Sequence, residues 1–537
     1  MKEQFEVKMD EIIETQKTLY QKEIIDFQEI GHRFIQGEIT SNEFKVASGG
    51  MGVYAQRGGK EFMIRLRVLS GVLDIKTLEL ILKFAMDYNL PDVHLTTRET
   101  IQLHNLNFDD LIAIMEKSLN SNLFTRGGGG NYPRNVSLSP LSGVEIGEAF
   151  DVTPYAVLVN KYFLSRMDSY KLPRKFKVAF SNNKNDSANA TIADLGFLAV
   201  KQDENNLFKV YIGGSLGNQG DTSVPFDELV SPKEVLYHVE ACIRLLMEEG
   251  DFENRGKARM RFIVKRMGRE AFLNCYKKIL LQVKQSLNLE LVLKNEDSLS
   301  TKVRDCEELC EQQNLISQKQ IGLYSIVIHA KGGILKREDL NLITSFLQTI
   351  PEAQIRLSME EDMYIRNLPL LQAEKLLNLL KHIGQTTMIE RSISCIGVPT
   401  CQIGMGESQK LLTNIVTYFK NQGMLEDQGI LEDILPPIHI SGCLNSCSRH
   451  QVSDIGFCCK RKQVSQQAVE VYTLHIGGMT SELDTHFAKE YGDLLTNTIP
   501  LFLYELALSI NKKQLTFMKY MELYQEELQL ILVKYLV

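Results

Sequence analysis

Four cysteines in two pairs have the residue type and the spacing that a metal centre needs. Cys395 and Cys401 are separated by five residues in SCIGVPTC, and Cys443 and Cys447 are separated by three in SGCLNSC. Thiolates bind zinc and iron, and two separated pairs allow two loops to close on one centre. The second pair follows the apolar run ILPPIHI. We therefore expect it on a loop at a strand end, where a rigid scaffold usually carries its chemistry.

The spacing alone leaves three interpretations open: an iron–sulfur cluster, a zinc site or buried thiols without a metal. Zinc sites built from four cysteines favour two intervening residues, which neither pair has. A disulfide framework is not expected, because the chain shows no secretory leader and is too long to need cross-links. The remaining six cysteines are interpreted as packing residues: Cys242, Cys275, Cys306, Cys310, Cys458 and Cys459.

The composition is that of a globular protein with several domains. The chain has 537 residues, of which 44% are hydrophobic and 24% charged, enough for three or four domains. The net charge of −7, from 60 basic and 67 acidic residues, argues against bulk nucleic-acid binding. No apolar run reaches membrane-spanning length, and the charged start MKEQFEVKMDEIIETQ carries no apolar segment. We therefore expect a cytoplasmic protein with no nucleic-acid or membrane partner.

Two halves of the chain resemble each other at a nearly constant separation. MIRLRVLSGVLDIKTLELILKFA, from Met63, matches SIVIHAKGGILKREDLNLITSFL, which lies 262 residues later. VHLTTRETIQLHNL matches IRLSMEEDMYIRNL at the same separation. ADLGFLAVK and SDIGFCCK are 260 residues apart at Asp194 and Asp454, and VYIGGSLG and LHIGGMTS are 264 apart. Four matches in the same order indicate a duplication with pseudo-two-fold symmetry.

Each copy follows the pattern strand, glycine turn, helix and second strand. In the first copy, alternating apolar residues give way to a helical stripe at Leu78, Leu80, Ile81, Leu82 and Phe84. Such units with antiparallel sheets predict an α+β fold. A charged stretch near Glu290–Ser317 is the expected boundary between the copies.

The two copies differ in the residues that could do chemistry. The second copy holds all four thiols, whereas the stretch of the first copy that matches the second pair, SNNKNDS from Ser181, has none. The first copy holds cations that the second lacks, because Arg65 aligns with Val327 and Arg98 with Glu360. One half is therefore expected to hold a metal and the other to hold anions.

Basic residues cluster in the first half. Arg65 and Arg67 lie two apart on an expected strand and so face one side, as do Lys175 and Lys177 in LPRKFK. Each residue taken singly is typical of a solvated strand face, but together, within one copy, they favour an anion site. Arg134 in NYPRN belongs to the same group, and a further alternation, Arg255, Lys257, Arg259 and Arg261, follows in NRGKARMR.

A run of four glycines, Gly127–Gly130, directly precedes NYPRN. Its backbone amides could approach a carboxylate or an oxyanion. Taken alone, the glycines indicate a flexible loop.

With these residues in view, the chain resembles the sirohaem and [4Fe–4S] sulfite and nitrite reductases. The motifs that carry the resemblance are C-x5-C followed by G-C-x-N-x-C, together with TTR-x-x-x-Q, PRN and LPRKFK in this order, from about Gly52 to Gly478. The resemblance implies two ferredoxin-like units and two larger α+β units that enclose the cofactors. The expected units are residues 1–150, an N-terminal extension with the first ferredoxin-like unit; 151–316, the first sirohaem and substrate unit; 317–390, the second ferredoxin-like unit; and 391–537, the unit with the cluster ligands.

The resemblance also implies roles for individual residues. Cys395, Cys401, Cys443 and Cys447 would hold a [4Fe–4S] cluster, with Cys447 also bridging to the sirohaem iron, and Asn445 would lie near the macrocycle. Arg65, Arg134, Lys175 and Lys177 correspond to the residues around the bound anion. Arg98, Gln102, Arg255, Lys257 and Arg259 are expected to meet the carboxylates of sirohaem. His450 follows the cluster motif and is interpreted as a surface residue.

The implied reaction is a six-electron reduction of sulfite to sulfide, with nitrite reduction to ammonia as the alternative. Ferredoxin-linked nitrite reductases of plants and cyanobacteria tend to have asparagine at the second lysine of the LPRKFK motif, where this chain has Lys177, so sulfite is favoured. No G-x-G-x-x-G opens a helix after a strand, so the electrons are expected from a separate donor such as ferredoxin. The rival class, a non-catalytic iron–sulfur or zinc protein, accounts for the cysteines but not for the cations.

Overall fold

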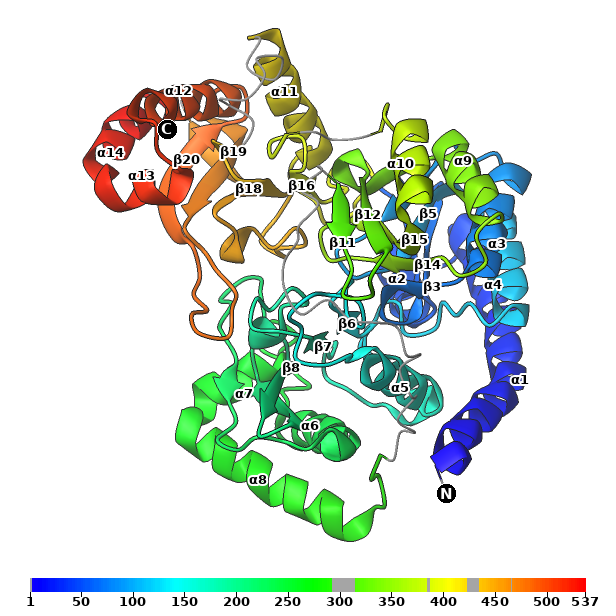
Figure 1. Cartoon of the computed structure of the whole chain (residues 1–537). Helices are drawn as coiled ribbons and strands as arrows, with labels where there is room; N and C mark the ends of the chain where they lie inside the picture. The colour runs from blue at the N-terminus through cyan, green and yellow to red at the C-terminus, as the bar shows by residue number, and fades with distance from the viewer. Residues whose placement is uncertain (1, 292–313, 384–386, 423–433, 465) are drawn as a thin grey trace.

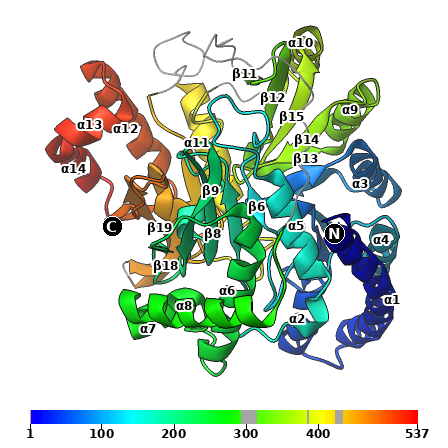
Figure 2. The same ribbon diagram turned by 60° about the horizontal axis from the view of Figure 1, so that its bottom comes forward.

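The computed structural model describes residues 2–291, 314–383, 387–422, 434–464 and 466–537. Cys306, Cys310 and most of the expected boundary stretch lie outside these residues. Four five-stranded sheets are arranged as two related pairs, with helices on their outer faces (Figures 1 and 2). Mixed helices and sheets of this kind make an α+β protein, as predicted.

The first pair of sheets belongs to the two ferredoxin-like units, and each sheet contains one strand from the other copy. The first sheet has the order β1 (Val53–Ala55), β2 (Phe62–Leu66), β5 (Ile101–Leu106), β4 (Asp92–Leu95) and β13 (Ile334–Lys336). The other has the order β11 (Leu315–Ser317), β12 (Leu323–His329), β15 (Asp362–Pro369), β14 (Gln354–Leu357) and β3 (Val72–Leu73). β13 pairs with β4 and β3 pairs with β14, so the copies exchange edge strands.

The second pair of sheets has the same topology in both copies. One has the order β10 (Val224–Pro225), β9 (Asn205–Ile212), β8 (Leu195–Gln202), β7 (Val178–Ser181) and β6 (Ser137–Leu138). The other has the order β16 (Ile393–Ser394), β17 (Ile438–Ser441), β18 (Ile455–Val464), β19 (Gln467–Ile476) and β20 (Lys489–Leu495). In each sheet, three neighbouring strands run parallel and the remaining pairs are antiparallel, which confirms the duplication. β6 shows that the second unit begins before the predicted boundary at residue 150.

Helices cover these sheets from outside. Those of the first half are α1 (Lys2–Ile35), α2 (Ser41–Gly50), α3 (Ile75–Asp87), α4 (Phe108–Asn120), α5 (Thr153–Leu164), α6 (Val235–Glu249), α7 (Met260–Met267) and α8 (Arg269–Ser286). Those of the second half are α9 (Arg337–Leu347), α10 (Leu370–Leu379), α11 (Ser408–Asn421), α12 (Ile499–Lys513), α13 (Phe517–Leu523) and α14 (Gln525–Val533). Short 3-10 turns at Leu69–Gly71, Met167–Ser169, Ala190–Ile192, Pro232–Glu234, Lys331–Gly333 and His450–Val452 link them. No helix of the described residues is long and apolar enough to cross a membrane.

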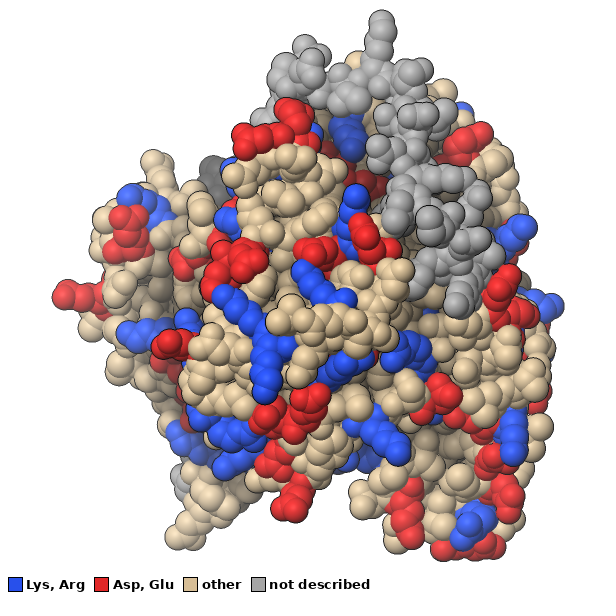
Figure 3. All heavy atoms as spheres, turned by 90° about the horizontal axis from the view of Figure 1, so that it is seen from below, with Lys and Arg blue, Asp and Glu red and all other residues tan. Residues whose placement is uncertain are grey.

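The helical stripe predicted in the first copy is the buried face of α3. Leu78, Ile81, Leu82 and Phe84 are buried, and Asp74 caps the helix by accepting a hydrogen bond from the Thr77 amide. The C-terminal helices α12 to α14 share an apolar core with β17 to β20. On the face seen in Figure 3, basic and acidic side chains are interspersed, in keeping with the small net charge.

The exchanged strands give a test of the architecture. Leu335, at the centre of β13, is fully buried and pairs with Val93 of β4. We expect Leu335→Ala to destabilise the protein by about 3 kcal/mol, since it removes buried methyl groups and leaves a cavity. Lys336→Ala, at the exposed neighbouring position, should change stability by less than about 0.5 kcal/mol. Urea unfolding measures both, and equal midpoints for the two variants would contradict the account.

Candidate functional site

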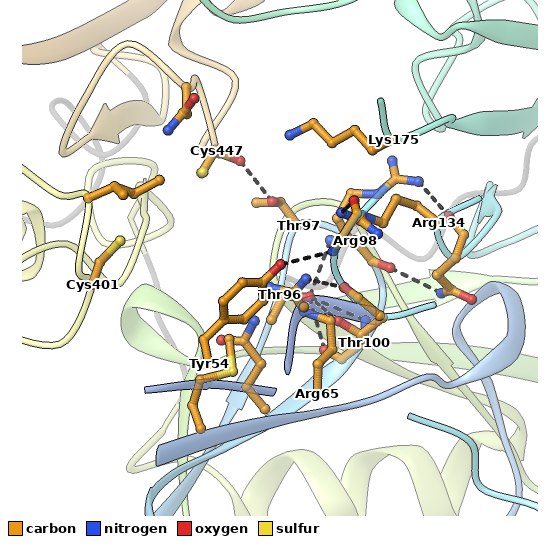
Figure 4. Close-up of a pocket in the computed structure, with 18 of the residues that line it drawn as sticks. Tyr54, Arg65, Thr96, Thr97, Arg98, Thr100, Arg134, Lys175, Cys401 and Cys447 are labelled. Atoms are coloured by element: carbon orange, nitrogen blue, oxygen red, sulfur yellow. Dashed lines mark hydrogen bonds between the residues drawn. The ribbon is translucent and has the colours of Figure 1, made fainter. Parts of the chain in front are cut away.

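A cavity of about 1110 Å³ lies where the two halves meet. The first half contributes β2, the β4–β5 turn, the glycine loop and the segment before β7, and the second half contributes the loops after β16 and β17. Figure 4 shows Cys401 and Cys447 on one side of this space and Arg98, Arg134 and Lys175 on the other. Sulfur ligands and cations from different copies therefore line one cavity, as the sequence predicted.

The four thiols lie on two loops that are tied together. Cys395 follows β16 and Cys443 follows β17, and the thiols of both residues, with those of Cys401 and Cys447, line the cavity. The Cys395 amide donates to the Ile440 carbonyl at 3.1 Å, and the Met405 amide donates to the Gly442 carbonyl at 2.8 Å. These backbone bonds fix the two thiol-bearing loops relative to each other.

Hydrogen-bond donors already point at two of the sulfurs. The Gly442 amide donates to Cys395 Sγ at 3.1 Å, and the Asn445 side-chain amide donates to Cys443 Sγ at 3.5 Å. Burial raises the pKa of the Cys395 thiol to about 12 and also raises the pKa of Cys401 and Cys443. Ionised thiolates therefore need the positive charge of a metal, which deprotonates the thiols that bind it.

The sulfur arrangement fits a multi-iron cluster better than a zinc ion. Zinc binds sulfur at about 2.3 Å, so four thiolates on one zinc lie within about 4 Å of one another. Within the described residues, no group of three or more His, Cys, Asp or Glu side chains is placed to hold a single metal ion. Four cysteines on two loops around one cavity are typical of a cluster that places each thiolate on a different iron.

The cations on the opposite wall are half-buried and have no carboxylate partners in the described part of the chain. Of the ion pairs in the described part of the chain, none involves Arg65, Arg98, Arg134, Lys175 or Lys177, which all line the cavity. Burial, with nearby Arg259 and Arg134, lowers the pKa of Lys175 to about 7, and burial and Arg98 hold that of Lys177 well below its ordinary value. Burial lowers the pKa of Arg134 to about 9. Buried cations are costly unless paired, so this wall is suited to binding anions.

The glycine loop positions two of these cations. Arg65 Nη1 donates to the Gly128 carbonyl at 2.6 Å, and Arg134 Nη2 donates to the Gly130 carbonyl at 2.7 Å. Arg134 Nη1 also donates to the Gly127 carbonyl at 3.2 Å. The loop therefore holds the guanidinium groups through its carbonyl oxygens.

The sequence left open that the backbone amides of the glycine run bind a carboxylate or an oxyanion. For three of the four amides this is wrong. The amides of Gly127, Gly128 and Gly130 donate to Gly50 O at 2.8 Å, Thr125 O at 3.0 Å and Tyr54 Oη at 3.2 Å. Glycine is required for close packing, because a Cβ at Gly129 would lie 2.2 Å from the Gly49 carbonyl oxygen. The segment is thus a packed loop.

The β4–β5 turn carries Arg98, and strand β5 carries Gln102; both were predicted as cofactor-binding residues. Arg98 Nη2 donates to the Asn135 carbonyl at 2.5 Å, and Asn135 Nδ2 returns a bond to the Arg98 carbonyl at 3.1 Å. Gln102 lies opposite Arg65 across β2 and β5, and its side-chain oxygen accepts from the Arg65 guanidinium at 2.5 and 2.9 Å in the amide orientation that satisfies both neighbours. Arg98 and Gln102 both line the cavity.

The basic residues before α7 lie in different environments, and only Arg255 among Arg255, Lys257 and Arg259 lines the cavity. Arg255 lines the cavity, whereas Lys257 is exposed and is not among the lining residues, so the role predicted for Lys257 is not supported. Arg259 Nη2 forms an ion pair with Asp194 Oδ2 at 2.9 Å. Arg259 therefore stabilises the structure behind the wall, and it does not line the cavity. The expected strand alternation is wrong because these residues form a loop that leads into α7, where Arg261 lies.

Some functional residues escaped the sequence analysis. Tyr54, Thr97, Arg174 and Arg449 line the cavity, and His450 is 2% exposed and packs against His475, which corrects its interpretation as a surface residue. Arg174 lies within LPRKFK, and Arg449 lies two residues after Cys447. Their position beside these two motifs could have identified them as cavity residues. The packing prediction holds for Cys242, Cys458 and Cys459, which are buried, whereas Cys275 is half-buried.

Two family models match the first half of the chain. The nitrite and sulphite reductase 4Fe-4S domain matches residues 129–284, and the nitrite/sulfite reductase ferredoxin-like half domain matches residues 54–120. Between them these ranges contain Arg65, Arg98, Arg134, Lys175 and Lys177.

Curated relatives match most of the chain at low identity. A ferredoxin–nitrite reductase of Synechococcus elongatus is 25% identical over 440 residues, which cover 80% of this chain and 82% of that protein. A sulfite reductase [ferredoxin] of Mycolicibacterium paratuberculosis is 24% identical over 431 residues, covering 79% and 74%. The sulfite reductase [NADPH] hemoprotein beta-component of Staphylococcus haemolyticus is 25% identical over 462 residues, covering 78% and 75%.

A solved structure shares the fold over nearly the whole chain. The NirA protein of Mycobacterium tuberculosis superposes with a TM-score of 0.78 at 20% identity, covering 91% of this chain and 92% of that one. The matched family models, the curated relatives and the cavity lined by thiols and cations all agree. The first half of the chain therefore carries the two domain types of the nitrite and sulphite reductase family, and the chain is similar to proteins of that family over most of its length.

Proposed function

We propose that this protein reduces sulfite to sulfide with six electrons from an external donor, using a sirohaem bridged to a [4Fe–4S] cluster. The observation that carries the proposal is the cavity lined by four thiols on one side and, on the other, by half-buried cations without carboxylate partners. A cluster carrier without catalysis would leave these cations unexplained, and so would a zinc protein.

The cofactors would be held by residues of both halves. Cys395, Cys401, Cys443 and Cys447 would bind the cluster, and Asn445, which already donates toward Cys443 Sγ, would lie near the macrocycle. Arg98, Gln102 and Arg255 would meet the carboxylates of sirohaem, because charge-assisted hydrogen bonds to buried carboxylates offset their desolvation. When bound, the pair of groups supplies electrons one at a time to a substrate kept in the cavity.

The chain's own cations would hold the anion and supply protons. Arg65 and Arg134 are fixed on the glycine loop and would stay positively charged at neutral pH, so they would bind the oxygens of the substrate. Lys175 has a pKa of about 7, the range in which an ammonium group can donate a proton and recover it. Lys177 lies on the same wall and is held in place because its amide donates to Asp194 Oδ2 at 2.9 Å.

Nitrite reduction to ammonia is the second candidate. The similar relatives include six proteins named as nitrite reductases and two named as sulfite reductases, all at 23 to 25% identity. Lys177 favours sulfite, because a second lysine adds positive charge where a dianion must bind. The donor is proposed to be a ferredoxin-like protein, since seven of these relatives are named for ferredoxin and one for NADPH.

Anaerobic purification followed by a spectrum and parallel assays tests the proposal. We expect the strong visible absorption of sirohaem and, with a chemical reductant, a higher kcat/KM for sulfite than for nitrite. A colourless protein, or the broad brown spectrum of a cluster alone, would exclude the reaction. A reversed ratio of kcat/KM values would establish nitrite as the substrate.

Lys177→Asn tests the basis of the substrate preference. Removing a half-buried ammonium from the anion wall should lower the ratio of kcat/KM for sulfite over nitrite by about tenfold, equivalent to about 1.4 kcal/mol of differential binding. Lys201→Asn, at an exposed position near the end of β8, serves as the control and should leave the ratio unchanged. Equal ratios in the Lys177 variant and the control would remove Lys177 from the specificity argument.

The depressed pKa of Lys175 predicts a pH dependence of anion binding. Sulfate is a suitable probe because its own charge is constant near neutrality. With a pKa of about 7, Lys175 loses its proton between pH 6 and 8, so sulfate affinity should fall by up to about tenfold over that range. Lys175→Met should bind sulfate more weakly at pH 6 and show a smaller fall. Isothermal titration calorimetry measures both.

The lowered pKa of Lys175 also predicts how the free energy of unfolding depends on pH, and this dependence has the opposite sign to that of sulfate affinity. Because the folded state holds Lys175 at about 7 and the unfolded chain near 10.5, the unfolded chain binds more protons between these values. The contribution of Lys175 to the free energy of unfolding should therefore rise with pH across that window, and Lys175→Met should flatten the rise.

For the sulfate experiment, a fall in affinity that is identical in the wild type and in Lys175→Met would contradict the pKa assigned to Lys175.

A further inference from the structure

The three residues Cys447, Ser448 and Arg449 are each held by a different contact. Thr97 Oγ1, from the first half, donates to the Cys447 carbonyl at 2.8 Å. His439 Nδ1, from β17, lies 2.7 Å from the Ser448 carbonyl oxygen. The side chain of Arg449 makes the remaining contacts, and it connects the segment to two other units of the protein.

Arg449 is a buried residue, 5% exposed, whose guanidinium reaches three acceptors. Its Nη2 donates to the Met359 carbonyl at 2.9 Å and lies 2.6 Å from Glu360 Oε1, both in the β14–β15 turn of the second ferredoxin-like unit. Its Nη1 donates to Asn189 Oδ1 at 3.1 Å, in the first half. The planar fork of arginine suits several acceptors in different directions, which a lysine ammonium would not match.

The duplication shows that this arrangement is specific to the second copy. Arg449 stands 260 residues after Asn189, and both adopt the left-handed backbone conformation, with φ of 61° and 57°. Glu360 stands 262 residues after Arg98. In the first copy the turn carries the cation, Arg98, and no carboxylate pairs with it within the described residues. In the second copy the turn carries a carboxylate, and Arg449 neutralises it.

Glu360 also connects Arg449 to the strand behind the cluster loop. Its Oε2 lies 3.9 Å from His439 Nε2, and the other nitrogen of that ring contacts the Ser448 carbonyl. The carboxylate of Glu360, the guanidinium of Arg449 and the imidazole of His439 therefore form a closed set of contacts around the backbone that follows Cys447. Breaking the pair would leave the guanidinium buried without its counter-charge, which is costly.

We propose that Arg449 and Glu360 form a latch that positions the sulfur of Cys447 in the cavity. The latch is a pair of positioning residues, because it acts on the backbone of Cys447 to Arg449 and not on a substrate. Its purpose rests on the proposed function, in which Cys447 would hold the cluster next to the sirohaem and its sulfur would therefore need an accurate position. A latch made of fixed contacts keeps that position whether or not the cofactors are bound.

Hydrogen exchange of the full-length protein, followed by mass spectrometry, tests the latch. The reporters are the amides of Arg449, which donates to the Ser446 carbonyl at 3.1 Å, and Val452, which donates to the Arg449 carbonyl at 3.0 Å. Arg449→Met and Glu360→Gln should speed exchange of the peptide spanning residues 443–452 by about tenfold or more, because local opening becomes easier. Arg449→Lys, which keeps the charge but loses the fork, should be intermediate.

A matched control separates the latch from a general loss of stability. Lys319→Met removes another contact between units, the ion pair of Lys319 Nζ with Glu148 Oε1 at 2.6 Å. It should leave exchange of residues 443–452 unchanged. Unchanged exchange of this peptide in Arg449→Met, or faster exchange that is equal in all peptides, would overturn the proposal.

The loaded protein provides an independent measurement. The latch variants should shift the visible spectrum of the bound tetrapyrrole or lower its occupancy per chain, whereas Lys319→Met should do neither. A spectrum and occupancy that stay at wild-type values in Arg449→Met would count against the positioning role. If the wild-type protein carries neither iron nor tetrapyrrole, the proposed function fails, and the exchange data still decide whether the latch exists.

Discussion

The cost of partly burying several positive charges without negative partners governs the organisation of this protein. Arg65, Arg134, Lys175 and Lys177 lie in one wall, and the pKa values of Lys175 and Arg134 are lowered by burial. A protein does not gain stability from such a wall, so the arrangement must be maintained for what it binds. The glycine loop, the β4–β5 turn and the ion pair of Arg259 with Asp194 all hold this wall in place.

Duplication explains how cations and thiols come to face each other. Two copies related by a pseudo-two-fold axis bring equivalent turns to opposite sides of one space, so a residue lost in one copy can be supplied by the other. The first copy kept the arginines and has no thiols in the matching loop, and the second has the reverse. The resulting cavity has two chemically different walls, which a single copy could not provide.

Much of this could be read from the sequence, and the exceptions share a cause. The α+β duplication, the four thiols and most of the anion wall follow from motifs and from matched segments. The sequence did not reveal that Arg259 is paired with Asp194, that the glycine amides are used internally, or that His450 is buried. Each of these depends on contacts between residues that are far apart in the chain. The exchanged strands β3 and β13, only two and three residues long, are too short to leave a pattern.

The exchange of edge strands has an evolutionary consequence. Because each inner sheet is completed by a strand of the other copy, a change of register or twist in one sheet would have to be matched in its neighbour. The backbone geometry of the two inner sheets is therefore coupled, although their side chains differ, as Arg65 and Val327 show. Each outer sheet is built from its own copy alone. The loops of one outer sheet could thus take up the thiols, and the segment before β7 in the other could take up Lys175 and Lys177, while the shared centre kept its backbone geometry.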